Sequence, residues 1–265
     1  MTQRFFQAMP EVGERIAQAP HLLLCLDYDG TLTKIVGDPA DAVLDRDTRA
    51  AVAELAGRED VTVAVVSGRT RSDLLARVDV PGLIYAGNHG LEISGPGFVF
   101  IEPTAAACRE ELHALASELT ARLNGIPGVI VEDKGLTISV HDRKVSLEQQ
   151  EEVRRLVHTT LANSRHPFQL THGDRVYDIR PRVHWDKGVA VAWIRKQVGR
   201  ADALAIYLGD DATDEDAFAS LREEITIKVG QNGETVAHYR LGSLGDVRKF
   251  LQWIISLRSR GRHSH

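Results

Sequence analysis

The 265-residue chain has only two cysteines, no long apolar run and no excess of basic residues. Cys25 lies in a predicted core strand and Cys108 on a predicted helix, so we expect reduced core thiols rather than a disulfide, as in a cytoplasmic protein. No apolar stretch approaches the roughly 20 residues that span a membrane. The net charge of −5 gives no support for nucleic-acid binding, which usually needs a basic stripe. The composition therefore predicts a cytoplasmic protein with no nucleic-acid or membrane partner and no sign of a protein partner.

The order of the predicted elements indicates an α/β core. Buried strands and helices alternate over the first hundred residues and again near the C-terminus, which predicts βαβ units and a parallel sheet. The expected strands are 22–26, 61–66, 83–86, 203–208 and 225–229, and the expected helices are 45–56, 71–78, 187–197 and 215–221.

The segment between these two halves has a different order. We expect helices at 105–124 and 147–163, and strand pairs at 129–133 with 136–141 and at 168–171 with 175–179. Gly-containing turns at 133–135 and 171–174 would close the two hairpins. The sequence thus predicts a doubly wound, Rossmann-like parallel sheet from residues 1–103 and 183–265, with an α+β cap domain inserted at 104–182.

Asp27-Tyr28-Asp29-Gly30-Thr31 follows directly on the apolar run 22–26. A strand buried on both faces places its next side chains at the carboxyl edge of a parallel sheet, where α/β proteins bind ligands. Two carboxylates there repel each other unless a cation lies between them, and Mg²⁺ is the usual ion, held by carboxylates and substrate phosphate. The first Asp could then be a nucleophile and the second a proton donor.

Two other interpretations of this motif must be considered. An EF-hand loop starting at Asp27 would need Gly at its sixth position and Glu at its twelfth, where this chain has Leu32 and Asp38. An ordinary solvated turn is harder to exclude from these residues alone. The other motifs of the chain have to decide between a turn and a site.

Three further motifs lie where a site at the sheet edge would need them. Ser67-Gly68-Arg69 ends the strand 61–66 and offers a hydroxyl and backbone N–H groups to phosphate oxygens. Lys187 begins a helix, where its ammonium could bind phosphate. The acidic run 209–216 follows the strand 203–208 and would supply the second half of a Mg²⁺ site.

Asp-x-Asp, then Ser, Lys and Gly-Asp-Asp, each at a strand end or helix start, resemble the haloacid dehalogenase (HAD) superfamily of phosphohydrolases. By this resemblance Asp27 is the nucleophile that forms an aspartyl-phosphate, and Asp29 is the general acid and base. Ser67 and Lys187 would hold the phosphoryl group. The implied metal ligands are the carboxylates of Asp27 and Asp210 and the backbone carbonyl of Asp29, and Asp214 would contact a metal-bound water.

A narrower resemblance, from about residue 22 to 218, is to the trehalose-6-phosphate phosphatase family. It rests on the motifs above and on Gly87-Asn88-His89-Gly90, Glu132-Asp133-Lys134 and the pair His141 and Arg143. The resemblance implies a Mg²⁺-dependent sugar-phosphate phosphatase of trehalose biosynthesis. The implied substrate-binding residues are Arg69, Glu132, Lys134 and Asp178.

The cap strands support a binding surface but leave the sugar open. Alternation along the strands gives an apolar face toward the helices and an opposite face with Glu132, Lys134, Ser139, His141, Arg143, Asp178 and Arg180. An ordinary wet sheet face would look the same. Asp178 stands where the family usually has Glu, and its side chain reaches about 1.5 Å less far.

Two alternatives therefore remain. The first is a phosphatase for another ester, such as a glucosylglycerate, glucosylglycerol or sucrose phosphate. The second is a receiver-like, non-catalytic sensor that binds phosphate or is phosphorylated on Asp27, although receiver domains have neither the second acid nor a large inserted domain.

Overall fold

The computed structural model describes residues 2–164, 167–173 and 175–260, and the chain divides into two compact units. Unit 1 is Met1–Phe100 with Trp185–His265, and unit 2 is Ile101–His184. The division expected from the sequence was at 104 and 182. Asp174, which the sequence places in a hairpin turn, lies outside the described residues.

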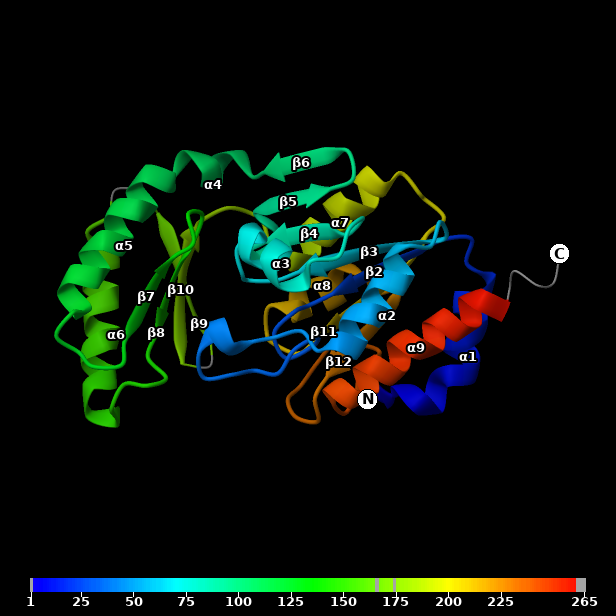
Figure 1. Cartoon of the computed structure of the whole chain (residues 1–265). Helices are drawn as coiled ribbons and strands as arrows, with labels where there is room; N and C mark the ends of the chain where they lie inside the picture. Colours follow the sequence, from blue (N-terminus) through cyan, green and yellow to red (C-terminus); the bar gives the residue numbers. More distant parts are fainter. Residues whose placement is uncertain (1, 165–166, 174, 261–265) are drawn as a thin grey trace. The chain divides into compact units, whose positions relative to one another are not determined.

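Unit 1 is built on a nine-stranded sheet with the order β1-β13-β12-β11-β2-β3-β4-β5-β6 (Figure 1). All neighbours from β1 to β4 run parallel, and β5 runs antiparallel to β4, which confirms the predicted mostly parallel sheet. The strands are β1 (Gln3–Arg4), β2 (Leu22–Leu26), β3 (Val61–Val66), β4 (Ile84–Gly87), β5 (Glu92–Gly95), β6 (Phe98–Ile101), β11 (Leu204–Gly209), β12 (Ile225–Val229) and β13 (Tyr239–Leu241).

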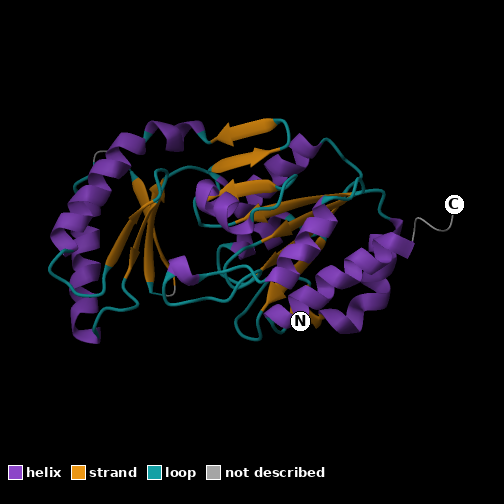
Figure 2. Ribbon diagram, in the orientation of Figure 1, coloured by secondary structure: helices purple, strands orange, loops and turns teal. Residues whose placement is uncertain are grey.

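Helices cover both faces of this sheet (Figure 2). The alternation along β2 shows how: Leu22, Leu24 and Leu26 belong to one core cluster, and Leu23 and Cys25 belong to the other. The first cluster contains residues of α1 (Phe5–Gln18), α2 (Arg46–Ala56), α3 (Arg71–Val78) and α9 (Leu244–Arg260), and the second contains residues of α7 (Lys187–Val198) and α8 (Asp214–Ser220). Every residue of β2 is buried, as the unbroken apolar run predicts.

The strand order has a switch point between β2 and β11. From β2 the chain continues through α2 to β3 on one side, and from β11 it continues through α8 to β12 on the other side. Helices α2 and α8 pack on opposite faces of the sheet, and in open α/β sheets such a reversal of strand order is where ligands bind, outside the carboxyl ends of the strands. Residues that follow Leu26 and Gly209 therefore occupy the position where open α/β sheets bind ligands.

Unit 2 has a four-stranded antiparallel sheet with the order β7-β8-β10-β9. Its hydrophobic cluster joins the sheet to two helices and includes Leu112, Leu119, Val153, Ile138 and Ile179. Its elements are α4 (Pro103–Ala107), α5 (Arg109–Leu123), β7 (Ile130–Asp133), β8 (Ile138–His141), α6 (Leu147–Ala162), β9 (Phe168–Gly173) and β10 (Val176–Pro181).

One predicted element of unit 2 is divided. The expected helix 105–124 is two helices, α4 and α5, which meet at Cys108. Pro103 at the first turn of α4 and Glu102, whose side chain accepts from the Ala105 N–H, start the first helix earlier than expected. None of the helices in the described ranges is both long and apolar enough to cross a membrane.

Candidate active site

Asp27 is placed at the switch point by the backbone that carries it. Its N–H donates to the carbonyl of Leu208, at 2.9 Å, and so extends the pairing of β2 with β11 by one residue. The residue is 4% exposed. Burial raises the pKa of Asp27 well above its usual range, and the positive charge of Lys187 opposes that rise.

Lys187, the first residue of α7, lies between two carboxylates. Its Nζ is 2.7 Å from Oδ1 of Asp27 and 2.7 Å from Oδ1 of Asp214, and its side chain is 2% exposed. Burial alone would lower the pKa of Lys187, but the adjacent charges of Asp214 and Asp27 raise it well above its usual value. The ammonium is therefore kept charged, although a lone lysine is usually solvated.

Both carboxylate oxygens of Asp214 accept hydrogen bonds that hold Lys187 and the neighbouring backbone in place. Its Oδ1 accepts from Lys187 and from the Tyr207 hydroxyl at 2.8 Å, and its Oδ2 accepts from the N–H groups of Asp210 and Asp211. A carboxylate offers about four lone pairs, and all four are used here. Asp214 thus orients Lys187 and the loop after β11, which argues against a direct role as a metal ligand.

The acidic groups at this edge are crowded. Asp27, Asp210 and Asp214 each have a carboxylate oxygen within 4.8 Å of the others. At that distance, two unit charges repel by about 3.5 kcal/mol with an effective dielectric constant of about 20. Burial, with the negative charges of Asp214 and Asp211, raises the pKa of Asp210 to about 7.

A hard divalent cation fits this donor set. Lys187 is one positive charge against three carboxylates, and Mg²⁺ prefers carboxylate and carbonyl oxygens. Since Asp214 is occupied by four donors, the carboxylates left for a metal are those of Asp27 and Asp210. Gly30 allows the Asp210 carboxylate to lie close to the backbone at residue 30. A Cβ there would lie 2.0 Å from Oδ2 of Asp210, and the φ of Gly30 is +83°.

Ser67 directly follows β3, and three hydrogen bonds hold it in place. Its N–H donates to Ala86, its carbonyl accepts from the His89 N–H, and its Oγ accepts from the Arg69 N–H at 3.2 Å. The Asn88 N–H donates to the carbonyl of Arg69, and both Asn88 and His89 have positive φ, at 50° and 58°. The motif 87–90 therefore packs against the Ser67 turn, and left-handed backbone at two successive non-glycine residues is typical of functional sites.

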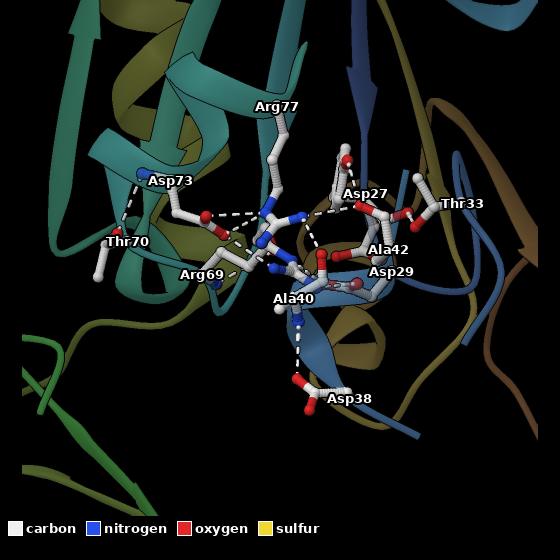
Figure 3. Close-up of polar contacts among 12 residues, drawn as sticks. Asp27, Asp29, Thr33, Asp38, Ala40, Ala42, Arg69, Thr70, Asp73 and Arg77 are labelled. Atoms are coloured by element: carbon white, nitrogen blue, oxygen red, sulfur yellow. Dashed lines mark hydrogen bonds and ion pairs between the residues drawn. The ribbon is translucent and has the colours of Figure 1, made fainter. Parts of the chain in front are cut away.

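The Asp29 carboxylate lies against Arg69 (Figure 3). Nε and Nη2 of Arg69 donate to Oδ2 and Oδ1 of Asp29 at 2.7 and 2.8 Å, and Nη1 donates to Asp73 at 2.8 Å. The sequence assigned Arg69 to the substrate, and that role stays a prediction. In the structure the guanidinium directs all three of its donor nitrogens at carboxylates of the protein.

The predicted sugar ligands belong to unit 2 and share a face of its sheet. Ser139 of β8 is paired with Glu132 of β7 and with Asp178 of β10, and the Ser139 hydroxyl donates to Asp178. Oε2 of Glu132 lies 3.2 Å from Nε2 of His141 and 3.7 Å from Nζ of Lys134. The residues form one polar cluster, with the carboxylate of Glu132 in contact with two potential cations.

The trehalose-phosphatase family model matches residues 25–243, which include every motif described above. The chain belongs to the trehalose-phosphatase family. It is 37% identical over 265 aligned residues to trehalose 6-phosphate phosphatase RA3 from Zea mays, covering 89% of this chain and 70% of the maize protein. It is 40% identical over 216 residues to a trehalose-phosphate phosphatase from Mycobacterium tuberculosis, covering 80% of this chain and 54% of that protein. The matched part of the chain thus spans about half the length of the mycobacterial relative.

Solved structures show the same fold. A trehalose-6-phosphate phosphatase related protein superposes with a TM-score of 0.80 at 24% identity, covering 90% of this chain and 99% of that one. A haloacid dehalogenase-like hydrolase from Bacteroides thetaiotaomicron superposes with a TM-score of 0.62 at 14% identity. The superposition covers 88% of this chain and 99% of that one. The predicted HAD-like fold and family resemblance are confirmed.

Sequence reasoning missed several residues around the site. The role of Tyr207 and the four hydrogen bonds of Asp214 are not signalled by any spacing, because they depend on contacts of α8 with α7 and β11. Asp73 and Arg77 could have been found, since Arg69, Asp73 and Arg77 follow one another at intervals of four and alternate in charge.

Proposed function

We propose that the chain is a Mg²⁺-dependent phosphatase that converts trehalose 6-phosphate to trehalose and inorganic phosphate. The observation that carries the proposal is the buried Asp27–Lys187 pair, beside Asp210 at the switch point, in a chain of the trehalose-phosphatase family. A carboxylate next to a fixed ammonium can attack a phosphoryl group whose negative oxygens the ammonium attracts.

In the first half-reaction, a carboxylate oxygen of Asp27 attacks phosphorus. The bond between phosphorus and the sugar oxygen breaks, and its electron pair goes to that oxygen, which takes the proton of the Asp29 carboxyl group. Lys187 and Ser67 bind the phosphoryl oxygens, so positioning and charge stabilisation supply most of the acceleration. Trehalose leaves, and phosphate remains on Asp27.

In the second half-reaction, water attacks the phosphorus of the aspartyl-phosphate. Asp29, now a carboxylate, takes a proton from that water. The bond between phosphorus and the Asp27 oxygen breaks, and its electron pair restores the Asp27 carboxylate. Inorganic phosphate is released, and both acids have returned to their starting states.

Mg²⁺ would be held by the carboxylates of Asp27 and Asp210 and by the backbone carbonyl of Asp29. The crowding of these carboxylates supports a divalent ion at this place. When bound, the ion neutralises negative charge on the phosphoryl oxygens and on its ligands.

The sugar would be recognised by unit 2. Glu132, Lys134 and Asp178 present carboxylates and an ammonium on one sheet face, and such groups are good partners for sugar hydroxyls. Site roles for these residues rest on the family resemblance and on their shared face. The cytoplasmic location expected from the cysteines also stays a prediction.

The substrate is tested by comparing esters. We expect trehalose 6-phosphate to give the highest kcat/KM in a panel with glucose 6-phosphate, sucrose phosphate, glucosylglycerol phosphate and glucosylglycerate phosphate. A site built to bind particular hydroxyls rejects esters that leave its polar groups unpaired, by up to about 10⁴-fold. The panel is measured on the wild type and on Asp178→Glu, which restores the longer side chain usual in the family.

Another ester preferred by more than about tenfold, or roughly 1.4 kcal/mol in transition-state binding, would overturn trehalose 6-phosphate as the substrate. It would leave a phosphatase for that ester. Failure to release inorganic phosphate from any ester would favour the sensor.

A second test separates sugar binding from chemistry. Glu132→Ala and Lys134→Ala are expected to reduce kcat/KM for trehalose 6-phosphate by about 10²-fold, and to change hydrolysis of 4-nitrophenyl phosphate little. The small ester has no sugar whose binding energy these residues could supply. Equal losses on both substrates would mean that the residues stabilise the fold of unit 2. The control is His113→Ala, a change at an exposed residue of α5.

A further inference from the structure

Arg69 stands in an alternating row of charges on unit 1. Asp29, Arg69, Asp73 and Arg77 follow one another, with each carboxylate bonded to the next guanidinium (Figure 3). The row thus contains two acidic and two basic side chains. The Arg69 side chain is only 10% exposed and lies between the carboxylates of Asp29 and Asp73, whose side chains are 37% and 33% exposed.

Arg69 binds Asp29 in the geometry that fixes a carboxylate best. Two parallel N–H bonds, from Nε and Nη2, hold both oxygens and therefore the plane of the carboxylate. They use one lone pair on each oxygen and leave the other for a reacting group. A single lysine ammonium in this position could not set the plane.

Arg69 is itself fixed from three sides. Its backbone is bonded to Ser67 Oγ and to the Asn88 N–H, its guanidinium carbon lies 5.3 Å from the ring centre of Tyr28, and its Nη1 donates to Asp73. The buried ring of Tyr28 gives a flat support for the guanidinium. Burial would lower the pKa of Arg69, but its bonds to Asp29 and Asp73 raise that pKa above its usual value.

The Asp73 carboxylate binds Arg69 rather than the backbone of the residue that caps its helix. Thr70 caps α3 by accepting from the Asp73 N–H, and the acid at this position of a capping box normally reaches back to the cap residue. Asp73 instead accepts from Arg69 and, with both oxygens at 2.7 Å, from Nε of Arg77. Helix propensity does not explain that choice, but a need to hold Arg69 does.

Arg77 connects the row to the segment that follows the Asp27 motif. Its Nη1 donates to the carbonyls of Ala40 and Ala42 at 3.1 and 2.9 Å, and the Tyr28 hydroxyl donates to the same Ala42 carbonyl. Hydrogen bonds of Arg77 and Tyr28 thus connect α3 and the segment 27–31 to residues 40–42.

We propose that Arg69 is a positioning residue for the Asp29 carboxylate, and that Asp73 and Arg77 hold Arg69 in place. The inference rests on the proposed function, in which Asp29 gives a proton to the leaving oxygen. It assigns the guanidinium of Arg69 to a side chain of the protein rather than to the sugar. A proton donor displaced by about 1 Å can cost about 10²-fold in rate, so this placement matters for turnover.

The test uses esters that differ in how much they need a proton donor. Trehalose 6-phosphate and glycerol phosphate have alkyl leaving groups, which must be protonated, whereas 4-nitrophenyl phosphate has a leaving group that departs as an anion. Values of kcat/KM cover the steps up to departure of the leaving group, and so exclude the later attack of water. Each ester is measured with wild type, Asp29→Asn, Arg69→Lys and Asp73→Asn.

We expect Asp29→Asn to lower kcat/KM for both alkyl esters by about 10²-fold or more, relative to the aryl ester. Arg69→Lys and Asp73→Asn should show the same selective loss, by about tenfold relative to the aryl ester. Asp73→Asn keeps the N–H that Thr70 accepts and leaves Arg69 present, so it reports on placement even if Arg69→Lys folds poorly. The matched controls are Arg71→Lys and Asp79→Asn, at the start and end of the same helix, and both should behave as wild type.

A loss confined to trehalose 6-phosphate would overturn the inference and make Arg69 a sugar ligand. Equal losses on all three esters, or none, would also overturn it, because neither pattern concerns the proton donor. The proposed function fails separately, when wild type does not hydrolyse trehalose 6-phosphate or when Asp29→Asn shows no preference among the esters.

Discussion

Asp27→Asn is expected to lower turnover of trehalose 6-phosphate by about 10³-fold or more, since an amide oxygen is neither a competent nucleophile nor a good Mg²⁺ ligand. The change should leave the fold intact. Asn has the same size as Asp, and Lys187 retains Asp214 as a charged partner at 2.7 Å. The measurement is steady-state phosphate release, with the melting temperature of each variant recorded alongside.

Asp186→Asn is the matched control for this change. Asp186 is adjacent to Lys187 and caps α7 by accepting from the Val189 N–H, a role that Asn fills equally well. The control should keep wild-type turnover. If Asp27→Asn retains a tenth or more of the wild-type rate, Asp27 is not the nucleophile.

Removal of divalent metal is expected to abolish activity, and addition of Mg²⁺ to restore it. Without the ion, Lys187 is one positive charge against the carboxylates of Asp27, Asp210 and Asp214, and excess negative charge at the site repels an anionic phosphate ester. Ca²⁺ should not replace Mg²⁺, because its longer bonds and looser coordination misplace the phosphate.

The same site gives a measurement that does not depend on activity. Mg²⁺ should raise the melting temperature of the wild type, since an ion that binds only the folded state stabilises it. Asp210→Asn should lose this increase, and Asp216→Asn, an exposed change in the same acidic run, should keep it. Full turnover after exhaustive chelation, or an unchanged response in Asp210→Asn, would exclude this metal site.

The placement of Asp27 and Asp210 at one edge of the sheet could be predicted from the sequence. The buried run at β2 and the one at β11 end next to Asp27 and Asp210, and parallel strands bring their carboxyl ends together. Helix α3 and strands β3 and β12 were predicted with the bounds that the structure has. Buried strands flanked by turn residues and well-capped helices carry strong local signals.

Other elements were missed although part of their signal is present. In α1, Phe5, Ala8, Val12 and Ile16 are buried at helical spacing, but Pro10 lies inside the helix and weakens the pattern. In α9, Val247, Phe250, Leu251 and Ile254 follow the same spacing and could have been recognised. Strand β13 has three residues and gains its place from pairing with β12, which no local pattern reveals.

The contacts that the sequence could not give are those between side chains far apart in the chain. Arg69 and Asp29 are 40 residues apart, and Lys187 and Asp27 are 160 apart. The strand order brings Lys187 near the edge, but only packing decides that its second partner is Asp214. The bond of Arg69 to Asp29 is a contact of this kind, and no pattern in the sequence predicts it.

The most direct test is a rapid acid quench of trehalose 6-phosphate with the Mg²⁺-loaded protein in excess, followed by peptide mapping. We expect free trehalose to form and the covalently bound phosphate to map to Asp27, with none bound in Asp27→Asn. Phosphate on another residue, or trehalose 6-phosphate left intact while another ester is hydrolysed, would contradict the proposed function.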